Sequence, residues 1–185
     1  DQRHAEIIVR ELGMNMKSKR LSAPAERREA VEEGSEQYLS SEEATMYRAL
    51  TARGIYLALD RSDIAYAVKE LSRGMSKPTE DHMEALKRLG RYLLGRPREV
   101  KVYGYQKAVN EVEVWTDTDF AGCKRTRNST SGGVATLGNH VLKTWSSTQA
   151  AIALSSAEAE YYGLVKGGSG AWGWKRRVRD LGHQC

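Results

Sequence analysis

The sequence predicts an α/β-class protein, more closely α+β, in which helices fill the first half and strands open the second. Two observations support this. Apolar residues recur every three or four positions up to about residue 95, and from residue 99 apolar and polar residues alternate. The period changes near residue 98, which we expect to be the boundary between two domains. A chain of 185 residues, 40% of them hydrophobic, is long enough to bury a core in each.

The first forty residues predict one short helix and a linker. Ala5, Ile8 and Leu12 lie at helical spacing and Gly13 supplies a stop, so a helix is expected over residues 3–12. Residues 14–40 combine dense charge with weak periodicity and are interpreted as a linker or an ordered surface loop. Residues 1–40 therefore form an N-terminal region.

Three helices are expected over residues 41–98. The first, over residues 41–59, carries few charges in its second half and is predicted to be largely buried. The second covers residues 63–73. The third begins after the N-cap residue Thr79, with an apolar stripe of leucines, and ends at Gly95 before Pro97.

Residues 99–185 predict antiparallel strands followed by one long helix. The runs VKVYGYQ, VEVWTDTDF, SGGVATLGN and HVLKTWSS read as consecutive strands, with a Gly138-Asn139 turn between the last two. Ser155 and Glu158 have the spacing of a capping box. The helix is expected to continue to about Leu181 and to approach the sheet closely through its glycines, with Trp172 and Trp174 as packing residues.

Composition favours an intracellular protein with a polyanionic partner. The net charge is +5 and basic residues cluster, which suits nucleic acid, although solvated helix faces explain each cluster equally well. Two cysteines without a CxxC pattern indicate a reducing compartment, cytoplasmic or nuclear, and no zinc site. No apolar run reaches the roughly 20 residues of a membrane span, and the N-terminal segment lacks the pattern of a secretory signal.

Two acidic residues on different elements predict a metal site. Asp117 lies within an apolar strand pattern, and Glu160 is placed on the stripe that runs through Ala157 and Leu164 and should face the sheet. Lone buried carboxylates are costly, and a divalent cation would compensate both. The alternative for Glu160 is an exposed glutamate at the edge of the stripe.

Several blocks in order resemble one family. The runs VWTDTDFAGCKRTRNSTSGG, LKTWSS and ALSSAEAEYYGL, with the helical segment from Tyr47 to Gly95 before them, are similar to the Pol polyprotein of copia-type long-terminal-repeat retrotransposons. In that family the blocks join the end of the reverse transcriptase to its ribonuclease H domain. The resemblance implies a reverse-transcriptase C-terminal or connection region over residues 41–98 and a partial ribonuclease H-like domain over residues 99–185, with a mixed sheet.

The resemblance also implies a chemistry. Asp117 and Glu160 would be catalytic residues that hold two Mg²⁺ ions for hydrolysis of the RNA strand of an RNA:DNA hybrid, with Asp119 in the following loop or as a supporting partner. The hybrid and the remainder of the Pol polyprotein would be the partners, and no membrane is involved. The expected nucleic-acid contacts, for which a plain turn is an alternative at the hydroxyls, are Lys124, Arg125, Arg127, Ser129 and Thr130.

One departure from the family pattern lowers the activity expected of the isolated chain. The family's third metal-binding aspartate sits on a strand after this helix, and the sequence stops at Cys185. We therefore expect weak metal binding and little or no cleavage. The alternative function is a non-catalytic nucleic-acid-binding or connection module, or the product of a decayed element.

Overall fold

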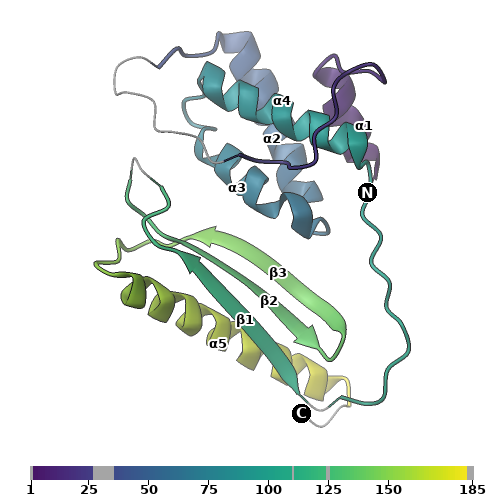
Figure 1. Cartoon of the computed structure of the whole chain (residues 1–185), viewed down its shortest axis with the longest axis vertical. Coiled ribbons are helices and arrows are strands. Elements are labelled where there is room, and N and C mark those ends of the chain that lie inside the picture. Colours follow the sequence, from purple (N-terminus) through teal and green to yellow (C-terminus); the bar gives the residue numbers. More distant parts are fainter. Residues whose placement is uncertain (1, 27–35, 110, 124–125, 183–185) are drawn as a thin grey trace. The chain divides into compact units, whose positions relative to one another are not determined.

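The computed structural model describes residues 2–26, 36–109, 111–123 and 126–182. The chain divides into two compact units, residues 1–100 and 101–185, which are described separately. Helices and an antiparallel sheet occur together, and the predicted α+β class is confirmed (Figure 1).

The first unit is helical. Its elements are α1 (Gln2–Glu11), α2 (Ser41–Leu57), the short 3-10 helix η1 (Ser62–Ile64), α3 (Ala65–Arg73) and α4 (Glu80–Gly95). The four predicted helices are confirmed, each to within two residues at either end. The described parts of the predicted linker, residues 14–26 and 36–40, contain no helix and no strand longer than a single bridge, Tyr38 to Thr79.

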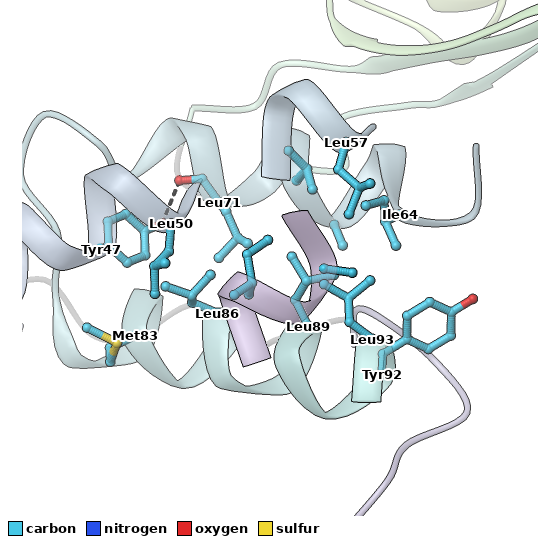
Figure 2. Close-up of a cluster of buried hydrophobic side chains, with 14 residues drawn as sticks. Tyr47, Leu50, Leu57, Ile64, Leu71, Met83, Leu86, Leu89, Tyr92 and Leu93 are labelled. Atoms are coloured by element: carbon cyan, nitrogen blue, oxygen red, sulfur yellow. Dashed lines mark hydrogen bonds between the residues drawn. The ribbon is translucent and has the colours of Figure 1, made fainter. Parts of the chain in front are cut away.

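Large apolar side chains from all four α-helices share one core. The stripe on α4, with Leu86, Leu89 and Leu93 fully buried, packs against side chains of α1, α2 and α3 (Figure 2). Tyr47 of α2 is also fully buried, and its hydroxyl donates a 2.6 Å hydrogen bond to the Leu71 carbonyl of α3. Helical periodicity thus yields a contiguous apolar interior.

A partly buried ion pair links the η1 segment to the end of α4. The Arg61 side chain is 4% exposed and holds the Asp63 carboxylate through two hydrogen bonds of 2.9 and 2.7 Å. Arg61 also donates to the Arg96 carbonyl, and the Tyr92 hydroxyl donates to Asp63. Burial raises the pKa of Asp63, but the hydrogen bonds from Arg61 and Tyr92 outweigh it and the net pKa is lowered.

The second unit is a three-stranded antiparallel sheet with one long helix. Its strands β1 (Val112–Asp119), β2 (Thr130–Leu137) and β3 (His140–Thr148) lie in the order β1-β2-β3, and α5 (Ser156–Asp180) runs along one face (Figure 1). Asp117 pairs with Gly132, and Gly133 pairs with Trp145. Gly138 in the β2–β3 turn has a φ of +56°, as expected for a tight hairpin.

The strand predicted over residues 100–106 is wrong, because that segment forms no ladder. Its side chains instead bind the β2–β3 hairpin. Gln106 accepts a hydrogen bond from the Asn139 N–H and donates to the Leu137 carbonyl, and the His140 ring lies against Tyr103. Side-chain contacts, and not backbone pairing, therefore hold this segment against the hairpin. Alternation of apolar and polar residues alone does not distinguish such a segment from a strand.

α5 extends to Asp180, so the predicted length holds despite its glycines. The Ser155 hydroxyl accepts from the Glu158 N–H, but the Glu158 carboxylate accepts from the Leu154 N–H, so the expected reciprocal capping box is only half formed. Trp172 is 80% exposed, which corrects its assignment as a packing residue. Among the described residues, no helix has the length and apolarity needed to cross a membrane.

Candidate functional site

Glycines on α5 bring this helix close to β1. A Cβ atom built on Gly163 would lie 2.6 Å from the Thr118 hydroxyl oxygen, and one on Gly167 would lie 2.5 Å from a Thr116 methyl group. Such distances leave no room for a side chain at either position. The face of β1 that α5 covers therefore carries Thr116 and Thr118.

Asp117 lies on the other face of β1, because successive side chains of a strand point to opposite sides. It is exposed, as are its neighbours on that face, Trp115 and Asp119. The Asp119 carboxylate folds over the turn that follows the strand, since a Cβ atom on Gly122 would lie 1.9 Å from one of its oxygens. Thr116 and Thr118, and neither aspartate, point to α5.

Glu160 is half-buried beside the stripe with which α5 contacts the sheet. That stripe consists of Ala159, Gly163 and Gly167, which are all buried. The stripe expected from the sequence, Ala157 with Leu164, is wrong, because both of these residues are exposed. The small residues occupy the contact face since only they allow the helix to approach the strand so closely.

The structure places the turn of α5 that follows Glu160 against the end of β1, but Asp117 lies on the face of β1 that α5 does not cover. Gly163, one helical turn after Glu160, meets Thr118, the residue after Asp117. Within the described ranges no group of three or more His, Cys, Asp or Glu side chains is arranged to hold a metal ion. The described residues therefore do not form a complete magnesium site, and the assignment of Asp117 and Glu160 stays a prediction.

The loop after β1 contains the predicted nucleic-acid contacts. Ser129 is fully buried and its hydroxyl accepts a 3.0 Å hydrogen bond from the Ala121 N–H, and Thr130 is 8% exposed. The Ser129 contact matches the plain turn that was the alternative at this hydroxyl, while Thr130 is the first residue of β2. Arg127 is exposed with a φ of +59°, while Lys124 and Arg125 lie outside the described residues.

Gln149 was not identified from the sequence, yet it connects the sheet to the helix. Its side chain is 9% exposed, and its amide nitrogen donates to the Ser131 hydroxyl of β2 and to the Ala159 carbonyl of α5. A single glutamine after a strand carries no sequence signal of such a role. Its carbonyl oxygen and the Thr118 hydroxyl are buried without a hydrogen-bond partner in the part of the chain that the structure describes.

The chain is similar to Pol polyproteins of plant transposons. It is 40% identical over 117 residues to the retrovirus-related Pol polyprotein from transposon RE1 of Arabidopsis thaliana, and 34% identical over 125 residues to that from transposon TNT 1-94 of Nicotiana tabacum. The matches cover 63% and 67% of this chain. It is also 35% identical over 130 residues to the secreted RxLR effector protein 161 of Plasmopara viticola, covering 69% of this chain and 83% of that protein.

The matched segment is a small part of each polyprotein. The chain spans 8% of the RE1 polyprotein and 9% of the TNT 1-94 polyprotein. No family model and no solved structure matches the chain. Each of these sequence matches is longer than either compact unit, so each extends into both units. The chain therefore belongs to the family of retrovirus-related Pol polyproteins of copia-type transposons.

Proposed function

We propose that this chain contributes two carboxylates to a ribonuclease H-type nuclease that hydrolyses the RNA strand of RNA:DNA hybrids within a copia-type Pol polyprotein. The observation that supports the proposal is the close contact of α5 with β1, where Gly163 meets Thr118. That contact fixes the helical turn carrying Glu160 beside the strand residue next to Asp117. A helix bearing larger side chains would hold the two carboxylates further apart.

The position of β1 in the sheet adds a second argument. In the described sheet β1 is the outermost strand on its side, next to β2 alone. This free edge is open to a further strand, and the resemblance places the family's third metal-binding aspartate on the strand that follows α5. Two carboxylates are too few for a pair of Mg²⁺ ions, so the proposal requires further oxygen ligands from elsewhere in the polyprotein. When bound, the ions would supply Lewis-acid activation of water.

Basic residues of the loop after β1 would bind the phosphates of the hybrid. Arg127 is exposed there, and no acidic residue follows Asp119 until Glu158. Contacts of this kind add affinity for any sequence and weaken with salt, because each one releases counterions. Selection for the hybrid would then rest on its shape and on the 2′-hydroxyl groups of its RNA strand.

The test is hybrid cleavage in a complete protein. This chain replaces the matching segment of the RE1 polyprotein, and release of labelled RNA from a hybrid is measured with Mg²⁺. Asp117→Asn and Glu160→Gln are each expected to lower the rate by roughly 10²-fold or more, because each removes a negative ligand of the Mg²⁺ ions, whose positive charge would stabilise the transition state. The matched control is Glu113→Gln, which changes an exposed carboxylate on the same face of β1 and should leave the rate unchanged.

A non-catalytic connection module is the second candidate. It is favoured by the placement of Asp117 on the face of β1 that α5 does not cover, and by the lack of a group of three metal-binding side chains among the described residues. The nuclease proposal fails if the RE1 polyprotein that carries this chain cleaves no hybrid while the unaltered RE1 polyprotein does. It also fails if all variants cleave at the same rate. In either case the second function is retained.

A further inference from the structure

The outward side of α5 carries a second stripe of large side chains, separate from the nuclease proposal. Tyr161, Val165 and Trp172 are 63%, 53% and 80% exposed. They lie roughly 180° around the helix from the small residues that contact the sheet. Exposed aromatic and aliphatic residues aligned on one helix face are typical of an interaction surface, while scattered ones are not.

Charged residues extend this stripe at both ends with opposite signs. Glu158 begins it, and Arg176 and Arg179 end it; both arginines are exposed. At 3.6 residues per turn the six side chains fall within an arc of about 60°. We call this set the outer stripe; its members are Glu158, Tyr161, Val165, Trp172, Arg176 and Arg179.

The outer stripe is palindromic in spacing. The intervals between its successive members are 3, 4, 7, 4 and 3 residues. Two such helices laid antiparallel therefore place each member opposite another one in the second copy. Val165 meets Trp172, Tyr161 meets Arg176, and Glu158 meets Arg179, and every contact occurs twice because a two-fold axis relates the copies.

Each of these pairs is chemically favourable. The isopropyl group of Val165 covers an indole ring, a guanidinium lies over a tyrosine ring, and a carboxylate meets a guanidinium. The Glu158 carboxylate is already held in place, since it accepts hydrogen bonds from the Leu154 N–H and the Tyr162 hydroxyl. A parallel arrangement would instead bring Arg176 against its own copy, and like charges disfavour it.

The middle of the stripe suits a close crossing. Gly168 and Ser169 lie at the centre of the palindrome, and a Cβ atom on Gly168 would meet nothing within 4 Å in the protein itself. Packing within the unit therefore does not require a glycine at residue 168, whereas it does at Gly163 and Gly167. Small residues at the crossing point let two helix backbones approach and let the flanking side chains interdigitate.

We infer that the outer stripe of α5 is a homodimerisation surface, which binds a second copy of this chain through an antiparallel, two-fold helix pair centred between Gly168 and Ser169. The pair uses a single helix from each copy, so it is a small interface. We expect a dissociation constant on the order of micromolar.

The test is sedimentation of the whole 185-residue chain over roughly two decades of concentration around that value. Val165→Lys and Trp172→Glu are each expected to weaken the dimer at least tenfold, because each places an unpaired charge in the apolar centre. The double variant sets the introduced lysine of one copy opposite the introduced glutamate of the other, so it should recover dimerisation. Val102→Lys is the matched control, since Val102 is 85% exposed and lies outside α5.

Three results would overturn the inference. A wild-type chain that is monomeric throughout the range excludes the dimer. A dimer that Val165→Lys leaves intact uses another surface. A dimer that both single variants abolish and the double variant does not restore lacks the antiparallel register. Far-ultraviolet circular dichroism of each variant shows that it remains folded, which is expected because both positions are exposed.

Discussion

The helical unit and the sheet unit are held together by different kinds of packing. In residues 1–100 the interior consists of large side chains, among them Tyr47, Leu86, Leu89 and Leu93. In the described part of residues 101–185 the buried apolar residues are Ala135, Ala153, Ala159 and Val178, and buried Ser129, Thr130, Ser131 and Gln149 accompany them. The first unit gains stability from apolar area, and the second from close approach and hydrogen bonds.

Both units also expose large apolar side chains. Tyr56 and Leu59 of the helical unit are 56% and 78% exposed, and the largely exposed ones of the sheet unit include Trp115, Leu154, Tyr161 and Trp172. Large apolar groups outside a core are available for binding a partner or a substrate. Large side chains therefore form the core of the helical unit, whereas the buried apolar residues of the sheet unit are small and its tryptophans Trp115 and Trp172 lie at the surface.

The largest loss of stability is expected from Leu89→Ala in the helical core. Leu89 is fully buried, and such a truncation costs about 2–5 kcal/mol through lost burial and a residual cavity. All four tryptophans, Trp115, Trp145, Trp172 and Trp174, lie in the sheet unit, so their fluorescence reports that unit alone. In denaturant, the part of the helical circular dichroism that comes from α1–α4 should be lost earlier, while the tryptophan transition and the part that comes from α5 keep their midpoint.

A matched change at an exposed position is the control for this experiment. Ile55→Ala truncates a side chain of α2 that is 42% exposed, so it should move the helical transition much less. If Leu89→Ala shifts the fluorescence transition by the same amount as the helical one, the two units unfold together and the contrast between them does not apply to their stability.

Smaller changes in the free energy of unfolding, of opposite sign, are expected from substitutions at two adjacent glycines of α5. Gly167→Ala inserts a methyl group where a Thr116 methyl already lies, so overpacking of about 1–3 kcal/mol outweighs the gain of about 1 kcal/mol in helix propensity. Gly168→Ala meets nothing within 4 Å and should stabilise by up to about 1 kcal/mol. The readout is the tryptophan transition. Equal shifts of one sign would mean that α5 does not touch β1 through this stripe.

The smallest effect is expected from Tyr47→Phe, which removes the buried hydrogen bond to the Leu71 carbonyl at a cost of about 1 kcal/mol. Burial raises the pKa of Tyr47 to about 12. An unfolded tyrosine ionises near pH 10, so above that pH the unfolded state binds fewer protons and stability falls until the folded pKa is reached. The wild-type helical unit should lose stability between about pH 10 and 12, and the variant should lose less.

The pH comparison has its own control. Tyr56→Phe changes a tyrosine of the same helix that is 56% exposed, and it should follow the wild-type decline. A Tyr47→Phe variant whose stability falls as steeply as that of the wild type would show that other groups cause the decline.

The sequence by itself determined the elements whose signals are local. The α4 helix follows from leucines at helical spacing between Thr79 and Gly95, because the helical period fixes which side chains share a face. The capping serine at residue 155 likewise marks the start of α5. The order of the sequence blocks was sufficient to indicate the copia-type Pol family, to which the chain belongs.

Only the tertiary structure decided which side of each element faces inward. Both faces of β1 carry polar residues, and the pattern does not tell whether Thr118 or Asp117 faces α5; the glycines of that helix, which allow contact through Thr116 and Thr118, decide it. The same contact turns Trp172 outward. The segment 100–106 alternates like a strand, yet it is bound by Gln106 to the hairpin. A local pattern specifies backbone geometry, whereas burial depends on partners distant in the sequence.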